Sequence, residues 1–355
     1  LFVANHQGGD VAVIDPVART VTHRIPMGVS SDPYNASMFP YGVLLSADGK
    51  KLYVSNWKEG NIAVVDVNNP DAAAIISRIP VGRHPNAMVL SPSGDRLFVA
   101  NANSDSVSVI DTTTDVVQFN IDVRPYKKAP FSSTPNALAV SPEGETLYVL
   151  NAGENAVVVV ELEDQQKKRG RHANQRDNGK RYEVKGRIPT GWYPTALSIS
   201  PTGDKLYVAN SKDVGLGQNA YPPIYIGDQM IGSLSVIDVP NAGTLKRYTR
   251  QVSENNMVAR GKAAVTGGDN IEGTHAGLLK QLPIKHVVYI LKENRTYDQI
   301  FGDLPGGNGD ASLLMFDDHS APNHRRLARD FVLLDNTYCD AEISKDGHEW
   351  SMGGN

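Results

Sequence analysis

Cysteine is almost absent from this sequence of 355 residues, in which Cys339 is the single example. One cysteine cannot form an internal disulfide, so cysteine usage leaves the redox compartment open. We expect Cys339 to be buried in a short apolar turn and inert, because no base is placed to activate its thiol.

Long apolar runs are also missing. No stretch of about 18 apolar residues is available, so we expect no transmembrane segment.

An excess of basic charge is missing too: the net charge is -4 and the pI is about 6.2. Such a chain lacks the positive field of a dedicated nucleic-acid binder, so no specific nucleic acid is expected as a partner.

The sequence has no initiator methionine and no signal peptide, and its first residues, LFVAN, already have strand character. We interpret it as an internal piece of a longer polypeptide, so the missing signal peptide says nothing about location.

What the sequence does contain is a repeat. The motif Leu-aromatic-Val-x-Asn occurs five times, beginning at Leu1, Leu52, Leu97, Leu147 and Leu206. Every copy except the first follows a Ser-x-x-Gly turn, which itself follows a Pro-x-Gly or Pro-x-Ala segment. An alternating apolar segment that closes with an acid comes next, as in VAVID and VVVVE. Period-two apolar runs separated by turn residues predict short antiparallel strands.

Each unit of this repeat therefore predicts four strands, the last being a segment such as RIPVG. Units of this size with four strands stack radially as the blades of a β-propeller. The repeat resembles the YVTN-type β-propeller family, whose members usually have seven blades. We predict a mainly β fold in which residues 1–250 form four full blades and one partial blade, with further blades upstream in the parent protein. The Asn and the acid that close the motifs are expected to serve turn chemistry.

Two blades carry long insertions. Residues 165–187 are rich in Lys and Arg and lie between two predicted strands. A solvated hairpin tip is the simpler interpretation, and docking to a polyanion is the alternative. Residues 213–232 include Tyr221, Pro222, Pro223 and Tyr225, and could pack on a second domain or serve the blade alone. The propeller could accordingly bind a protein or a polyanion.

After residue 250 the repeat stops, and residues 251–284 have the composition of a linker. Residues 285–291 (KHVVYIL) predict a strand buried on both faces, and residues 296–301 predict the start of a helix. Glu293 and Asn294 would then follow the carboxyl end of a central strand, where open α/β sheets bind their ligands. A carboxylate beside an amide oxygen suits a divalent cation, although helix capping is the ordinary role of such a pair.

The segment ENRTYDQIFGD resembles the signature of a phosphoesterase family within the alkaline-phosphatase superfamily, which contains acid phosphatases and phospholipase C-type enzymes. The resemblance implies that residues 285–355 begin an α/β phosphoesterase domain. It also implies that Glu293 and Asn294 bind a divalent metal ion of unknown identity, whereas Arg295, Tyr297 and Asp298 are scaffold.

The same family places a Ser or Thr nucleophile at a helix N-terminus, shortly after a second strand, which we expect at residues 331–334. Backbone N–H groups and the helix dipole would hold the phosphate there. Thr337, Ser344 and Ser351 are the candidates, and Ser344 is preferred because it falls in the turn before HEWSMGG. The family's Pro-Thr-x-Pro-Asn pattern is replaced here by SKDGHEW, so the assignment stays open. His348 could contact phosphate or lie exposed on a helix.

The resemblance therefore implies a periplasmic or secreted metal-dependent phosphoesterase fused to a propeller, with a phosphate ester as substrate. Because the family draws further Asp and His ligands from beyond this stretch, residues 1–355 alone are expected to be inactive. The alternative is a binding or cell-surface protein whose second domain is catalytically incomplete.

Residues 317–324 contain four side chains that could bind a metal ion, but their spacing is not that of metal ligands. We therefore expect these side chains to be solvated: Asp317, Asp318, His319 and His324.

Overall fold

The computed structural model describes residues 1–29, 37–127, 129, 132–162, 182–213, 231–258, 283, 285–286, 288–292, 294–335 and 347–348. The chain divides into two compact units, Leu1–Asp269 and Asn270–Asn355. Each unit is described by itself. In the described part of the chain, no helix combines the length and the apolarity that a bilayer crossing requires.

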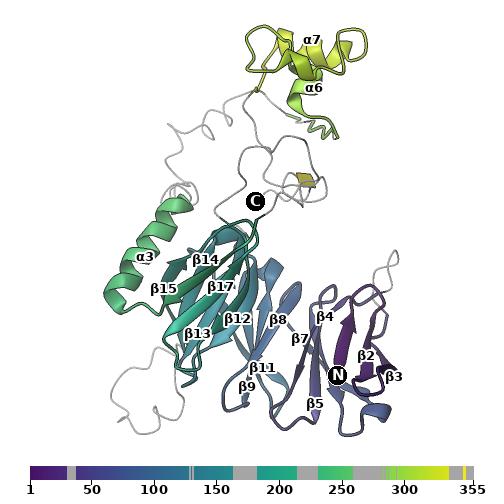
Figure 1. Cartoon of the computed structure of the whole chain (residues 1–355), viewed down its shortest axis with the longest axis vertical. Coiled ribbons are helices and arrows are strands. Elements are labelled where there is room, and N and C mark those ends of the chain that lie inside the picture. Colours follow the sequence, from purple (N-terminus) through teal and green to yellow (C-terminus); the bar gives the residue numbers. More distant parts are fainter. Residues whose placement is uncertain are drawn as a thin grey trace. The chain divides into compact units, whose positions relative to one another are not determined.

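The first unit consists of five antiparallel sheets that follow one another in chain order (Figure 1). Within every sheet, strands that are neighbours in the sequence pair directly, as in a meander. Sheet 1 contains β1 (Phe2–Asn5), β2 (Asp10–Asp15) and β3 (Thr20–Pro26), and sheet 2 contains β4 (Pro40–Leu45), β5 (Lys51–Asn56), β6 (Asn61–Asp66) and β7 (Ala74–Pro80). Sheet 3 contains β8 (Pro85–Leu90), β9 (Arg96–Asn101), β10 (Ser106–Asp111) and β11 (Val116–Asp122). Sheet 4 contains β12 (Pro135–Val140), β13 (Thr146–Asn151), β14 (Ala156–Leu162) and β15 (Tyr182–Pro189), and sheet 5 contains β16 (Pro194–Ile199), β17 (Lys205–Asn210) and β18 (Ser233–Asp238).

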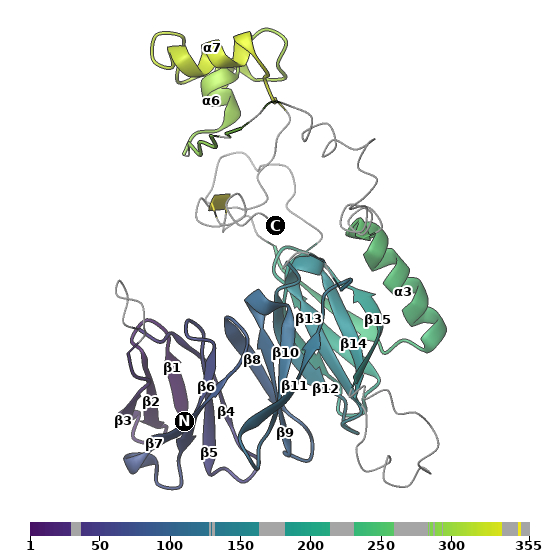
Figure 2. The same cartoon turned by 180° about the vertical axis from the view of Figure 1, so that it is seen from behind.

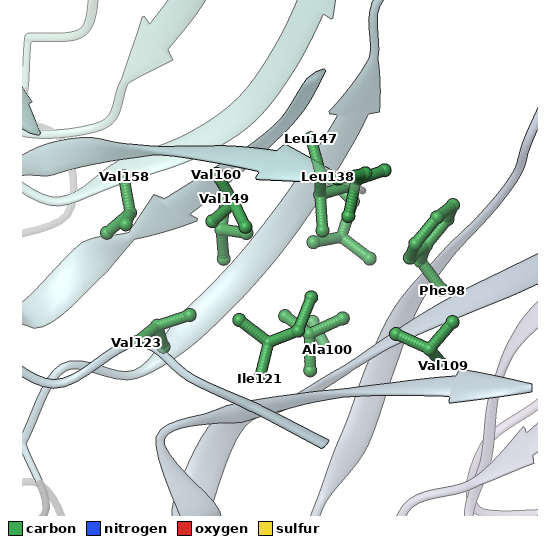
Figure 3. Close-up of a cluster of buried hydrophobic side chains, with 12 residues drawn as sticks. Phe98, Ala100, Val109, Ile121, Val123, Leu138, Leu147, Val149, Val158 and Val160 are labelled. Carbon is green, nitrogen blue, oxygen red and sulfur yellow. The ribbon is translucent and has the colours of Figure 1, made fainter. Parts of the chain in front are cut away.

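The core lies between the sheets, because alternate residues of each strand point to opposite faces. In β5, Leu52 and Val54 pack against sheet 1, whereas Tyr53 packs against sheet 3. The same division recurs at each junction, so four buried clusters separate the five sheets. Figure 3 shows the cluster between sheets 3 and 4, where Phe98 and Ile121 face Leu138 and Val149. The predicted propeller-like stacking of the repeats is confirmed by this arrangement.

The number of complete blades was overestimated, since sheets 2, 3 and 4 have four strands but sheet 5 has three. Helix α3 (Ala242–Asn255) follows β18 instead of a fourth strand and packs on β15, as both views show (Figures 1 and 2). The Asn241 side chain begins the helix by accepting a hydrogen bond from the Thr244 N–H at 3.0 Å. Leu245 and Val252 bury the apolar face of the helix.

The first strands of the sheets, β4, β8, β12 and β16, lie next to one another. Side-chain amides link them: Asn86 donates to the carbonyl of Pro135 at 3.2 Å, and Asn136 donates to the carbonyl of Pro194 at 2.9 Å. The first strands therefore form the inner wall of the five-sheet unit. The turns before them gather at one end of that wall.

In the second unit, the predicted strand at residues 285–291 is wrong. Its described residues form no strand, and Val288, Tyr289 and Ile290 are 82%, 63% and 79% exposed. The strand expected at residues 331–334 is likewise absent, and Phe331 is 76% exposed. An apolar run becomes a buried strand only when neighbouring strands pair with it. The described residues of this unit contain no strand that could do so, and they give no support to the predicted α/β domain.

The described part of the second unit is helical, with α6 (Tyr297–Phe301), the 3-10 helix η4 (Ala311–Leu313) and α7 (Pro322–Asp330). The predicted helix start is confirmed by α6. Arg325 is the centre of this unit and is 1% exposed. Its guanidinium donates to Asp303 at 2.7 Å, to Asp318 at 3.1 Å and to the Ile300 carbonyl at 2.6 Å.

The remaining members of the Asp and His group in residues 317–324 have local partners. Asp317 accepts the backbone N–H groups of His319 and Ser320, each at 3.0 Å, which closes a turn. The His324 ring nitrogen lies 3.3 Å from the Lys292 ammonium. Asp318 joins the Arg325 network described above.

Candidate functional site

The residue before each inner strand has an unusual backbone conformation. Phe39, His84, Thr134 and Tyr193 have φ values of 50°, 53°, 49° and 47°, and each precedes a proline. This left-handed conformation costs an L-residue with a side chain about 1–2 kcal/mol, whereas glycine adopts it without that cost. Large or β-branched side chains at such positions are genuine outliers, and outliers of this kind cluster at functional sites.

Hydrogen bonds from the turn after the second strand of the same sheet hold these residues. The carbonyl of Phe39 accepts the Trp57 N–H at 3.0 Å, and the carbonyl of His84 accepts the Ala102 N–H at 3.1 Å. The equivalent bonds in sheets 4 and 5 run from Ala152 to Thr134 and from Ser211 to Tyr193, each at 3.1 Å. The four side chains are thereby presented from a fixed backbone.

At sheets 1 to 3 these turns bring five rings together, and we call His6, Phe39, Tyr41, Trp57 and His84 the rim cluster. The His6 ring stacks on Phe39, with centroids 4.8 Å apart, and meets Tyr41 and Trp57 edge-on. The Trp57 ring stacks on His84 at 3.7 Å with an interplanar angle of 10°. His6 and Tyr41 are exposed, whereas Phe39, Trp57 and His84 are half-buried.

Exposed aromatic and basic side chains occur in the same turns elsewhere. Trp192 and Tyr193, before β16, are 54% and 44% exposed. The Lys212 ammonium lies 5.2 Å from the Tyr193 ring centroid, and the Lys58 ammonium lies 5.4 Å from that of Phe39. Flat rings beside cations suit a polar organic ligand with an apolar face.

The rim cluster can supply proton transfer as well as binding surface. Imidazole is the side chain most often used as a general acid or base, so His6 and His84 are the candidates for that role. No group of three or more His, Cys, Asp or Glu side chains arranged for a metal ion occurs among the described residues.

The rim cluster was not predicted from the sequence. The available signal was the doublet at the start of each repeat, in which a bulky or aromatic residue precedes the proline: Phe39-Pro40, His84-Pro85, Thr134-Pro135 and Tyr193-Pro194. The doublet marks a rim residue only when its backbone is left-handed and when turns from different repeats meet at one end of the sheets. The repeat alone specifies neither condition.

The residues predicted from the phosphoesterase resemblance are not brought together by the described structure. Ser344 and Glu293 lie outside the described residues, as do Thr337, Cys339, Ser351 and most of both insertions. Asn294 is exposed and has a φ of 71°, and His348 is half-buried. The metal and substrate roles given to these residues stay predictions.

Comparison with known proteins gives one family match: the model described as "Lactonase, 7-bladed beta-propeller" matches residues 1–120, about a third of the chain. No curated protein matches. Similar solved structures include one from Bacteroides uniformis, provisionally assigned as a 6-phosphogluconolactonase. It shares 16% identity over 67% of this chain and 68% of its own, with a TM-score of 0.47.

Two further structures show a similar level of likeness. A protein from Lactobacillus plantarum shares 22% identity over 59% of this chain and 60% of its own, with a TM-score of 0.46. A second provisional 6-phosphogluconolactonase, from Bacteroides fragilis, shares 17% identity over 67% of both chains, with a TM-score of 0.45. TM-scores this low support no conclusion about activity.

The family match corrects the function predicted from the sequence. The prediction of a metal-dependent phosphoesterase fused to a YVTN-type propeller is wrong, because the model that matches describes a lactonase propeller. The matched model is named for a lactonase and not for a phosphoesterase. The coarser prediction, a hydrolase built on a β-propeller, agrees with this match.

Proposed function

We propose that the first unit hydrolyses a lactone and that the reaction takes place at the rim cluster. The lactonase family match carries this proposal, because the matched residues 1–120 include all five members of the rim cluster. The rim cluster supports it independently, since it combines imidazoles with exposed aromatic faces at the end of the inner strands.

The reaction needs a base for water and an acid for the leaving oxygen. A neutral imidazole of the rim cluster accepts a proton from water while the water oxygen attacks the lactone carbonyl carbon. The ring C–O bond then breaks, and the ring oxygen takes the proton back from the imidazolium. The product is a hydroxy carboxylic acid. The aromatic faces would bind the apolar face of the lactone ring and keep its carbonyl near the imidazole.

The test is a kinetic assay of ring opening with the purified chain and a panel of five- and six-membered lactones. His84→Gln and His6→Gln each remove one imidazole, and His23→Gln in the outer strand β3 is the matched control. Loss of a general base typically lowers the rate by about 100-fold or more. We expect such a loss in at least one rim variant and none in the control. Equal activity of all four proteins, or no activity with any lactone, would overturn the proposal.

A further inference from the structure

The turn after the Leu-aromatic-Val-x-Asn strand, which is β1, β5, β9 or β13, differs between sheets at two equivalent positions. The last turn residue has a left-handed backbone in each of the first four sheets: Gly9, Gly60, Asp105 and Asn155. The first turn residue is His6, Trp57, Ala102 and Ala152 in the same order. Sheets 1 and 2 thus combine a ring with glycine, whereas sheets 3 and 4 combine alanine with Asp or Asn.

In sheets 3 and 4 the Asp or Asn side chain holds the left-handed residue of the next sheet. Asp105, which is 1% exposed, accepts the Thr134 N–H at 3.0 Å. Asn155 accepts the Tyr193 N–H at 2.7 Å. These hydrogen bonds fix the backbone of the neighbouring rim residue and leave the side chain of that residue unrestrained by them.

In sheets 1 and 2 glycine offers no side chain, and the ring at the first turn position stacks on the same residue of the next sheet. His6 stacks on Phe39 and Trp57 stacks on His84. A stack at 3.7 Å orients the partner's ring, which a hydrogen bond to its backbone does not. The repeat therefore exchanges a backbone restraint for a ring restraint at the sheets that carry the rim cluster.

We infer that Trp57 is a positioning residue for His84, and that His84, so oriented, is the imidazole that acts on the substrate at the rim cluster. His6 then takes the place of Trp57 at the preceding junction and orients Phe39. This inference rests on the proposed function for the part that concerns catalysis. The stacking itself is independent of that function.

The sharpest variant replaces the ring restraint with the backbone restraint that sheets 3 and 4 use. Trp57→Ala combined with Gly60→Asn reproduces the pair found at Ala152 and Asn155, and asparagine tolerates the left-handed backbone of position 60. Trp57→Phe keeps a flat ring, and Trp57→Leu removes it without touching Gly60. Tyr207→Phe changes a partly exposed ring in β17 of sheet 5, outside the rim cluster and its turns, and is the control.

Two readouts are needed. In lactone hydrolysis, the double variant and Trp57→Leu should lose about 10- to 100-fold in kcat with little change in KM, the size of loss that misplacing a catalytic group causes. Trp57→Phe and Tyr207→Phe should stay within about 3-fold of the parent. By NMR, the His84 ring protons should move downfield in the double variant and in Trp57→Leu, because the ring current of Trp57 is lost.

The inference is overturned if the His84 ring signals stay in place without Trp57, or if the variants that lack the ring keep the parent kcat. The NMR readout needs no substrate. A shift of the ring signals in a protein that opens no lactone would refute the proposed function and leave the positioning of His84 by Trp57 supported.

Discussion

At the scale of the residue, the rim contains residues with large side chains at left-handed backbone positions, where glycine would cause less strain. Tyr193 and His84 occupy left-handed backbone positions before proline, and hydrogen bonds from neighbouring turns hold them there. Part of the free energy of folding therefore offsets the strain of these backbone positions, which place rings at one end of the sheets. Side chains fixed in this way can bind without reorganisation, which favours both affinity and catalysis.

A second residue-scale feature is the carboxylate of Asp318, which we predict contributes to the acid sensitivity of the second unit. Hydrogen bonds from Arg329 and Arg325 lower its pKa to about 2. Since the pKa in the unfolded chain is about 4, Asp318 contributes stability above that pH, and the contribution is lost as the pH falls from about 4 to 2. The protection factors of the α7 amides, which are exchange rates corrected for the intrinsic pH dependence, should therefore fall over this range when measured by NMR.

Asp318→Asn is the control for this prediction, because an amide cannot titrate there. Its α7 amides should have lower protection factors than those of the parent at pH 6, and these factors should change less between pH 4 and 2. Identical pH profiles for parent and variant would show that the two ion pairs of Asp318 do not stabilise α7.

At the scale of the element, α3 packs closely on β15 because of one glycine. A Cβ at Gly186 would lie 2.4 Å from the Thr249 hydroxyl oxygen and 2.8 Å from Leu245 Cγ. The residues at the same register position of β3, β7 and β11 are His23, Ser77 and Phe119. Of these four equivalent positions, the one that is covered by the helix is the one that carries glycine.

Gly186→Ala should consequently destabilise the first unit by about 1–3 kcal/mol, the usual cost of overpacking a close contact. Ser77→Ala is the matched control at the equivalent position of β7 and should change the free energy of unfolding by less than about 0.5 kcal/mol. Urea denaturation followed by circular dichroism measures both. Equal stability of the two variants would mean that α3 does not depend on this contact.

The elements also show what sequence can and cannot predict. The strands that begin at Lys51, Arg96 and Thr146 could be predicted because local alternation and turn residues specify them. Helix α3 was not predicted, although Leu245, Tyr248 and Val252 have helical spacing, because residues up to 250 were assigned to the propeller blades and residues from 251 to a linker. The strand at residues 285–291 was predicted from apolarity alone, which does not supply a pairing partner.

At the scale of the whole molecule, each sheet is stabilised by the next. Tyr148 of sheet 4 is 4% exposed because it packs against sheet 5, in the cluster that contains Leu206 and Val208. Tyr207, the equivalent residue of sheet 5, is 36% exposed. The same repeat position is thus buried in one sheet and partly open in the next.

Tyr148→Ala and Tyr207→Ala are therefore a matched pair. The first should cost about 3–5 kcal/mol, as for other buried aromatic residues, and the second less than half as much. Thermal or urea unfolding of the two variants measures the difference. If Tyr207→Ala were as destabilising as Tyr148→Ala, something other than packing between successive sheets would determine the contribution of this position.

The account as a whole depends on the rim cluster being the place where a lactone is opened. The most direct measurement is kcat/KM for lactone opening by the parent, His84→Gln and the His23→Gln control at one pH near neutrality. We predict that His84→Gln loses about 100-fold or more, because the general base is removed, whereas His23→Gln keeps the parent value. A full rate in His84→Gln would contradict the account.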